Sequence, residues 1–178
     1  VEIVNIREYE LSSSMKEQLS ALLSTCFPDS LKQGRIYFKQ LPHFRLLAME
    51  GETIVGNLGI DCRIINVGGT ILNIFGGIDL CVHPDRQGSG LGATLLEAAE
   101  KIAVGSSQDF ITLIAERHDL YERQGFQRIQ PADTKWFAIE DRASVVLLEE
   151  DLSDCFMAKQ LGERPWPSGQ IDMLGYLF

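Results

Sequence analysis

The chain has 178 residues and a formal net charge of −9 at pH 7, and 45% of its residues are hydrophobic. This length suits one domain with a substantial core, whereas the acidic balance argues against a nucleic-acid-binding protein, which normally carries a basic surface. No apolar run approaches the ~20 residues that a membrane-spanning helix needs, and the charged, alternating N-terminus predicts a first strand instead of a signal peptide. A cytoplasmic protein is therefore expected.

The cysteines and histidines show no metal-binding spacing. The four cysteines, Cys26, Cys62, Cys81 and Cys155, stand far apart among apolar neighbours. Small core residues in a reducing compartment are therefore expected, and disulfides are not. The three histidines are equally scattered, so neither a structural nor a catalytic metal is predicted.

The N-terminal part of the chain predicts a strand followed by two helices. Residues 1–7 alternate in polarity, as in a strand. Ser14-Met15-Lys16-Glu17 fits a capping box at the start of a helix that Pro28 ends. A second short helix is predicted for residues 30–40.

From Phe44 onward the pattern changes to strands. Residues 44–49, 53–65 and 71–82 predict an antiparallel meander whose turns contain Gly51 and Gly68-Gly69. Gly76-Gly77 in the third strand suggests a bulge or the close approach of another group.

The second half of the chain begins with a predicted helix after Gly92, and further strands follow. Residues 110–115 form a continuous apolar run, which predicts a strand buried on both faces. The other expected elements are a brief helix at 119–124 closed by Gly125, strands at 126–129 and 143–148, and an irregular tail at 166–178 that packs back on the domain.

Three glycines at alternate positions, Gly88, Gly90 and Gly92, stand where a predicted strand is followed by a helix. Glycine lets the backbone come close to a ligand, and the first amides of a helix bind anions. The loop is therefore predicted to hold the pyrophosphate of a nucleotide-derived cofactor.

The spacing of the glycines can be compared with known phosphate-binding motifs. A Walker-type loop is excluded because no Lys-Ser or Lys-Thr follows the glycines. A Rossmann fingerprint, Gly-x-Gly-x-x-Gly, fits poorly because the third glycine arrives one residue early and because residues 83–87 separate the strand from the loop. A glycine-rich turn without a ligand is a further alternative.

Two blocks of sequence narrow this choice. The first is Leu80-Cys81-Val82-His83-Pro84 followed by Gln87-Gly88-Ser89-Gly90-Leu91-Gly92, and the second is Leu120-Tyr121-Glu122-Arg123-Gln124-Gly125-Phe126. Together they resemble the GNAT superfamily of acyl-CoA-dependent N-acyltransferases, with its Gln/Arg-x-x-Gly-x-Gly/Ala signature and its Leu-Tyr-x-x-x-Gly-Phe element. The resemblance spans residues 1 to about 148, so one domain of residues 1–178 with a C-terminal extension from 148 is expected.

This resemblance implies an α/β (α+β) fold with a mixed, twisted central sheet of about six to seven strands and helices on both faces. The strands at 79–82 and 110–115 would splay apart to admit acyl-CoA, with acetyl-CoA as the expected co-substrate. The backbone of Leu80, Cys81 and Val82 would pair with the pantetheine arm. The pyrophosphate would lie against the amides of Gln87, Gly88, Ser89, Gly90, Leu91, Gly92 and Ala93.

The resemblance also implies direct attack of a substrate amine on the thioester. A general base must then remove a proton from the amine, and a general acid must protonate the leaving thiolate. Tyr121 matches the acid position of the second block, and the Val82 amide would donate to the thioester oxygen. Asp79 is the favoured base, because strands buried on both faces seldom carry unpaired charge; Asp61 and Glu116 are its rivals.

One departure from the family pattern concerns the pantetheine contact. The family often has an asparagine some residues before the tyrosine, and residues 115–118 occupy that region here. His118 and Arg123 are therefore expected to bind CoA instead, with Arg117 as a third candidate. His83 is expected to order the loop, and the Cys81 side chain to point into the core.

The tail is faintly similar to the C-terminal region of nodulation-factor acyltransferases and aminoglycoside 2′-N-acetyltransferases. In sum, the sequence predicts an N-acetyltransferase that acts on a primary amine of a small molecule, and a cationic amine would suit the acidic charge. No nucleic-acid or membrane partner is expected, and the oligomeric state is left open, with a homodimer as one option. The alternatives are a non-catalytic acyl-CoA-binding domain and a nucleotide-binding oxidoreductase.

Overall fold

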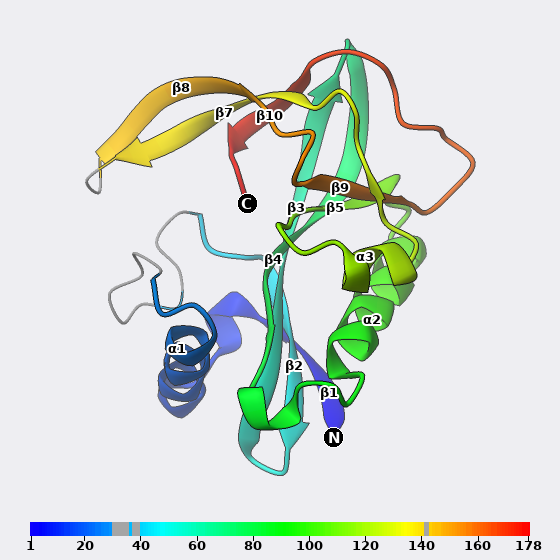
Figure 1. The fold of residues 1–178 in the computed structure, drawn as a ribbon. Helices are drawn as coiled ribbons and strands as arrows, with labels where there is room; N and C mark the ends of the chain where they lie inside the picture. Colours follow the sequence, from blue (N-terminus) through cyan, green and yellow to red (C-terminus); the bar gives the residue numbers. More distant parts are fainter. Residues whose placement is uncertain (30–35, 37–39, 141–142) are drawn as a thin grey trace. The chain divides into compact units, whose positions relative to one another are not determined.

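The computed structural model describes residues 1–29, 36, 40–140 and 143–178, and the chain divides into two compact units (Figure 1). Unit 1 contains Val1–Asp61 and Gly77–Lys101, and unit 2 contains Cys62–Gly76 and Ile102–Phe178. The prediction of a single domain stays a prediction. Apart from residues 36 and 40, the helix predicted at 30–40 lies outside the described residues.

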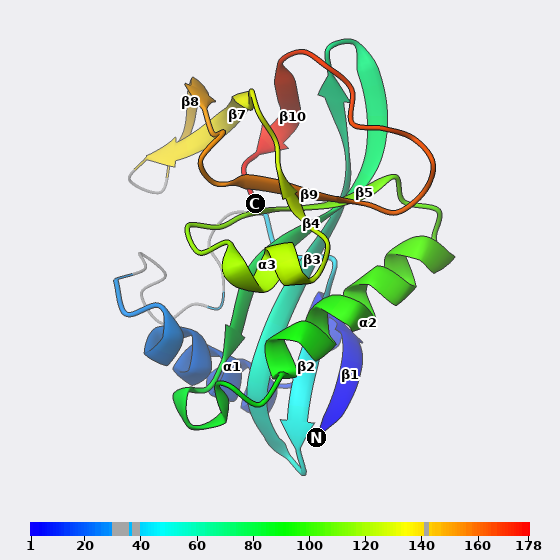
Figure 2. The ribbon, with the colours of Figure 1, turned by 45° about the vertical axis from the view of Figure 1, so that its right-hand side comes forward.

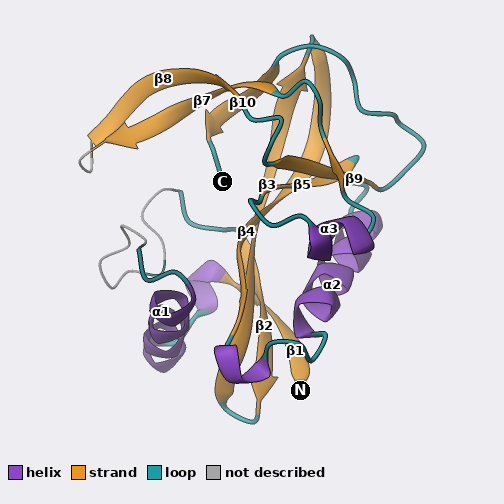
Figure 3. Cartoon of the chain, in the orientation of Figure 1, coloured by secondary structure: helices purple, strands orange, loops and turns teal. Residues whose placement is uncertain are grey.

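Within the described residues the chain forms ten strands and three α-helices (Figure 3). The strands are β1 Glu2–Arg7, β2 Phe44–Glu50, β3 Thr53–Val67, β4 Thr70–Val82, β5 Phe110–Ile114, β6 Gln127–Arg128, β7 Asp133–Glu140, β8 Ala143–Asp151, β9 Phe156–Gln160 and β10 Ile171–Tyr176. The α-helices are α1 Ser13–Cys26, α2 Leu91–Gly105 and α3 Asp119–Arg123, and the 3-10 helices are η1 Glu8–Glu10 and η2 Pro84–Arg86.

Unit 1 carries a sheet in which β2 pairs antiparallel with both β1 and β3. Neighbouring residues of a strand point to opposite faces, and the two faces are covered by different helices (Figure 2). Leu47 packs with Leu22 of α1 in one core cluster. The next residue, Ala48, pairs with Gly56, where an added Cβ would lie 3.3 Å from Leu95 of α2. The expectation of helices on both faces is therefore confirmed in this unit.

Helix α1 starts two residues earlier than the sequence predicts. Its N-cap is Ser12, whose backbone is extended (φ −67°, ψ 162°) and whose hydroxyl accepts a hydrogen bond from the Met15 amide at 3.2 Å. The predicted capping box at Ser14 is therefore wrong, because Ser14 already lies inside the helix. Ser12, Ser13 and Ser14 are all suitable caps by residue type, and only the direction in which the chain enters the helix selects one of them.

Unit 2 carries a mixed sheet, as predicted. Its strands follow the order β6-β9-β5-β4-β3-β10-β7-β8. Only the parts of β3 and β4 within Cys62–Gly76 belong to this unit. β5 pairs antiparallel with β9, whereas β10 pairs parallel with β7. The strand count in the described residues exceeds the six to seven expected, because β7, β9 and β10 were not predicted.

The predicted irregular tail is wrong for residues 171–176, which form β10 between β3 and β7. Ile171 and Met173 are fully buried, so the strand does alternate. The alternation of buried and exposed residues is interrupted at Leu174, which has a left-handed backbone (φ 50°), and by a shift of register before Tyr176. A strand was therefore not predicted here.

Within unit 2, residues of the tail contact other elements. The Trp166 ring meets the Phe110 ring edge-on, with 4.9 Å between centroids. The close approach suggested by Gly76 is also confirmed, because a Cβ added there would lie 2.5 Å from the ring of Phe178. Only glycine leaves room for that ring.

Candidate active site

The glycine loop of unit 1 has the geometry of an anion site. Gly88 and Gly90 have positive φ angles of 76° and 85°, and both positions face open space. Helix α2 follows at once, and its first backbone hydrogen bond runs from the Thr94 amide to the Gly90 carbonyl at 3.0 Å. The amides of residues 91–93 precede that bond, so no helical carbonyl is available to them. They provide N–H donors and the positive end of the helix dipole.

Side chains on both sides hold this loop in place. Arg86 donates from Nε to Glu50 Oε1 at 2.7 Å and from Nη2 to Glu50 Oε2 at 2.9 Å, which ties η2 to the turn after β2. The Ser89 hydroxyl donates to the Arg86 carbonyl. The Asp85 amide donates to Nδ1 of His83 at 3.3 Å, so His83 orders the loop as expected. Because Arg86 already pairs with Glu50, the loop offers an anion mainly backbone amides.

The strand before the loop contains an unusual residue. Asp79 is half-buried and has a left-handed backbone, with φ at 51°. A non-glycine residue costs roughly 1–2 kcal/mol in this conformation, so surrounding contacts must hold it there. The Asn57 side-chain amide supplies one, donating to the Asp79 carbonyl at 2.9 Å.

Asn57 is itself held by a buried ion pair. Arg45 donates from Nη1 to Asn57 Oδ1 at 3.2 Å, and from Nε to Glu8 Oε2 at 2.7 Å and Nη2 to Glu8 Oε1 at 3.3 Å. The side chains of Arg45 and Glu8 are only 0% and 8% exposed. A fully buried arginine needs such satisfied partners. The chain of contacts therefore runs from η1 through β2 and β3 to Asp79.

The predicted pantetheine strand continues through Leu80, Cys81 and Val82. Leu80 and Val82 are half-buried, and Cys81 is buried toward α1, as predicted. The Val82 carbonyl accepts from Sγ of Cys26 at 3.6 Å and from Nε2 of Gln87 at 3.2 Å. These two bonds occupy both lone pairs of that oxygen, so the backbone group of Val82 that remains to bind a ligand is its N–H.

The thiol of Cys26 is affected by its neighbour. A hydrogen bond from Cys81 lowers the pKa of Cys26 to about 7.

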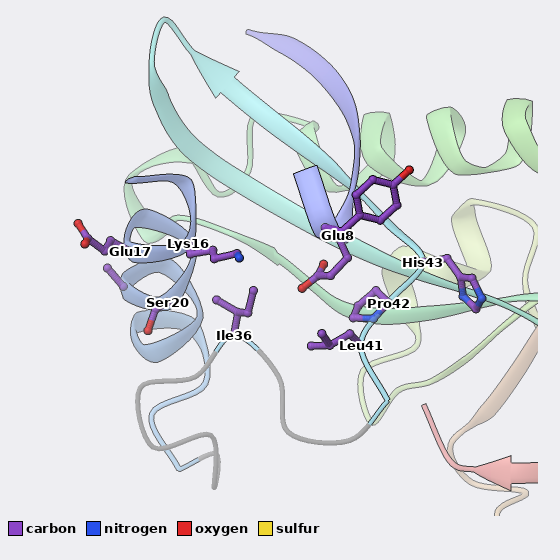
Figure 4. A pocket seen from close by; sticks show the side chains of 10 residues that line it. Glu8, Lys16, Glu17, Ser20, Ile36, Leu41, Pro42 and His43 are labelled. Atoms are coloured by element: carbon purple, nitrogen blue, oxygen red, sulfur yellow. The ribbon is translucent and has the colours of Figure 1, made fainter. Parts of the chain in front are cut away.

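A cavity of about 990 Å³ lies beside this network in unit 1 (Figure 4). It is lined by η1, by α1 and by residues 41–43 before β2. His43 stands on its wall, with Nδ1 3.1 Å from Oδ1 of the buried Asp61. Asp61 was a rival base in the sequence analysis, and its partner His43 was not predicted.

The remaining predicted site residues belong to unit 2. Tyr121 lies in α3 with its ring edge-on to Phe126, 5.9 Å between centroids, and burial raises the pKa of its hydroxyl. Nε2 of His118 lies 3.1 Å from the Ala115 carbonyl oxygen. Arg123 and Glu116 are exposed. The site roles of all these residues, like those of Asp79 and the loop, stay predictions.

Sequence reasoning missed Glu8, Arg45, Asn57 and His43. A signal did exist for Arg45, which interrupts an otherwise apolar run in β2. Arginine in such a run is seldom buried without a partner. The partner itself is not readable from the sequence, because Glu8 lies in a separate element.

The described part of the chain was searched for metal sites and for membrane-spanning helices. No group of three or more His, Cys, Asp or Glu residues there has the geometry to hold a metal ion. Among the described helices, none is long and apolar enough to cross a membrane.

Comparisons with known proteins show which domain and which fold the chain resembles. The family model of the acetyltransferase (GNAT) domain matches residues 42–128. No curated protein matches the chain. A GNAT family N-acetyltransferase from Escherichia coli, solved in complex with CoA, superposes with a TM-score of 0.66 at 16% identity, covering 97% of this chain and 89% of that one.

Two further solved structures share the fold. A GNAT family acetyltransferase from Brucella melitensis, in complex with acetyl-CoA, has a TM-score of 0.61 at 17% identity, over 96% of this chain and 94% of that one. A GCN5-related N-acetyltransferase from Anabaena variabilis has a TM-score of 0.61 at 19% identity over 71% of this chain, which spans only 32% of that protein. The residues matched by the family model contain the glycine loop, β4, β5 and α3. Residues 42–128 therefore match the GNAT acetyltransferase domain, and the chain shares the fold of these acetyltransferases.

Proposed function

We propose that the protein transfers an acetyl group from acetyl-CoA to a primary amine of a small molecule. The observation that carries this proposal is the loop at residues 87–93, in which two left-handed glycines precede the free amides of α2. Two proteins of the same fold were solved with CoA or acetyl-CoA, which supports the same co-substrate here.

The loop suits the pyrophosphate of CoA for a physical reason. Several amides and a helix dipole stabilise a doubly charged group without a dedicated cation. The ion pair of Arg86 with Glu50 keeps the loop shaped while leaving the amides to the ligand. The half-buried Leu80 and Val82 and the left-handed Asp79 just before the loop then become the pantetheine side of the site.

The chemistry we propose is direct attack of the amine on the thioester carbonyl. The C–N bond forms, the C–S bond breaks, and the thiolate of CoA leaves with a proton from Tyr121. Burial raises the pKa of this phenol, so it stays protonated at neutral pH and is able to donate. The Val82 N–H would stabilise the oxyanion. Asp79 is the base that the sequence favours.

One pair of measurements tests this function. Thermal unfolding is followed with acetyl-CoA, with NAD and with NADP, and thiol release from acetyl-CoA is then followed with a panel of primary amines. Stabilisation by acetyl-CoA alone together with amine-dependent thiol release is the expected result. Stabilisation by NAD alone would favour the oxidoreductase alternative. Acetyl-CoA binding without transfer to any amine would favour a non-catalytic binding domain.

A further inference from the structure

The cavity of unit 1 has the size of a small-molecule site. Its volume of about 990 Å³ falls at the upper end of ordinary ligand pockets, roughly 300–1,000 Å³. Figure 4 shows Lys16 and Ser20 of α1 on one side, and Leu41, Pro42 and His43 on the other. The apolar residues of the wall suit an amine with an apolar body.

His43 is held in this wall by its backbone and by its side chain. Its amide donates to the Ile60 carbonyl at 2.8 Å, and its carbonyl accepts from the Glu8 amide at 3.2 Å. Its ring nitrogen Nδ1 lies 3.1 Å from Oδ1 of Asp61. The Asp61 side chain is 4% exposed, whereas that of His43 is 46% exposed. A buried carboxylate thus orients a half-exposed imidazole.

The position of Asp61 bears on which ring nitrogen of His43 is able to accept a proton. When Nδ1, which lies 3.1 Å from Oδ1 of Asp61, carries the hydrogen, the lone pair of a neutral imidazole lies on Nε2. The His43 side chain is 46% exposed beside this buried carboxylate. A carboxylate that fixes the tautomer in this way prepares a histidine to accept a proton at Nε2 and then stabilises the imidazolium.

The pair also lies close to the strand before the glycine loop. Asn57, Gly59 and Asp61 alternate along β3, so their side chains share one face. At Gly59 an added Cβ would meet Pro42 at 3.2 Å and Ile78 at 3.3 Å. Residues 41–43 and the start of the segment 78–82 therefore pack over the same glycine, next to the carbonyl that Asn57 holds.

Other ionisable groups on the cavity suit the role of base less well. Both carboxylate oxygens of Glu8 accept hydrogen bonds from Arg45. Lys16 carries a positive charge, and Glu17 lies on the exposed side of α1. A carboxylate is in general a weaker base toward an ammonium group than an imidazole.

We propose that His43, oriented by Asp61, is the general base of the reaction and that the cavity beside it holds the acceptor amine; this inference rests on the proposed function. Nε2 takes one proton from the ammonium group and leaves a neutral amine. The amine attacks the thioester carbon, and the second proton it loses on forming the C–N bond ends on the departing thiolate by way of the acid. The imidazolium then releases its proton to water.

The test compares one acceptor that needs a base with one that does not. Thiol release from acetyl-CoA is measured with phenethylamine, which is protonated at pH 7, and with methoxyamine, which is neutral. His43→Gln is expected to lower kcat about 10²–10⁴-fold with phenethylamine, and only a few-fold with methoxyamine. Asp61→Asn is expected to cause a smaller loss of the same kind. Asp109→Asn, which removes a carboxylate paired with Arg164, is the control and should leave both rates unchanged.

Each result has a defined meaning. Free imidazole should restore part of the phenethylamine rate to His43→Ala. Equal losses with both amines would mean a structural role and overturn the proposal, as would a fully active His43→Gln. Loss in Asp79→Asn but not in His43→Gln would assign the base to Asp79. No transfer by the unmodified protein to any amine would instead overturn the proposed function, and this inference with it.

Discussion

The side-chain amide of Asn57 donates a hydrogen bond to the carbonyl of Asp79, 2.9 Å away, at the one point of β4 where the backbone is left-handed. This contact joins the buried pair Glu8–Arg45 to the strand that precedes the glycine loop. A side chain therefore provides a partner for this carbonyl.

Asn57→Leu removes both ends of this bridge. The Arg45 guanidinium and the Asp79 carbonyl each lose a buried partner, and each loss costs about 1–3 kcal/mol. The free energy of unfolding, measured in urea, should fall by about 2–6 kcal/mol, the sum over the two groups. Asn66→Ala, which removes only an exposed turn contact to Gly69, should cost less than about 1 kcal/mol. Equal effects of the two variants would contradict the network.

Glu8→Gln leaves the charge of Arg45 buried without its counter-ion. Breaking one side of a buried ion pair typically costs about 3–5 kcal/mol. Glu10→Gln is the matched control, because Glu10 pairs with Arg7 at the surface, where such pairs contribute little to stability. Chemical denaturation of both variants measures the difference, and a loss below about 1 kcal/mol for Glu8→Gln would argue against the role of the pair.

Gly90→Ala should weaken acetyl-CoA binding by at least tenfold, because a Cβ is introduced where the backbone must approach the pyrophosphate. Gly69→Ala controls for backbone strain. Gly69 has a φ of 90°, close to the 85° of Gly90, and both positions are open. Isothermal titration of the two variants against acetyl-CoA separates the cases. Equal affinities would rule the loop out as the phosphate site.

Tyr121→Phe should lower kcat about 10²-fold or more while acetyl-CoA affinity stays within twofold. Burial raises the pKa of Tyr121, so the phenol remains protonated above the ordinary range of tyrosine. The alkaline fall of kcat that belongs to this group should therefore come at a higher pH than for a solvent-exposed phenol, and it should vanish in the variant. Tyr176→Phe is the control, and an unchanged kcat in Tyr121→Phe would remove the residue from the mechanism.

Cys26 should be the first cysteine to react with iodoacetamide as pH rises. The hydrogen bond from Cys81 lowers its pKa to about 7, and the thiolate is the reactive form. Cys155 is the internal control, because burial raises its pKa. Cys81→Ala should move the midpoint for Cys26 upward. Mass spectrometry of labelled peptides at several pH values measures both midpoints, and coincident midpoints would contradict the assignment.

Local patterns in the sequence were sufficient for the elements that lead to the glycine loop. The meander of β2, β3 and β4 follows from apolar runs separated by glycine turns, and α2 follows from the helical spacing after Gly92. The motif at Leu120–Phe126 also indicated α3 and its glycine end, where Gly125 has a φ of 84°. Such features depend on neighbours a few residues away, so a single sequence contains them.

The tertiary structure decided the features whose partners are distant. His43 lies beside Asp61, and Arg45 pairs with Glu8; each pair joins different segments of the chain. The N-cap at Ser12 and the strand β10, with its left-handed Leu174, likewise depend on how the chain enters and leaves its neighbours. The type of a residue indicates which kind of partner its side chain needs. Only the folding of the chain brings that partner within hydrogen-bonding distance.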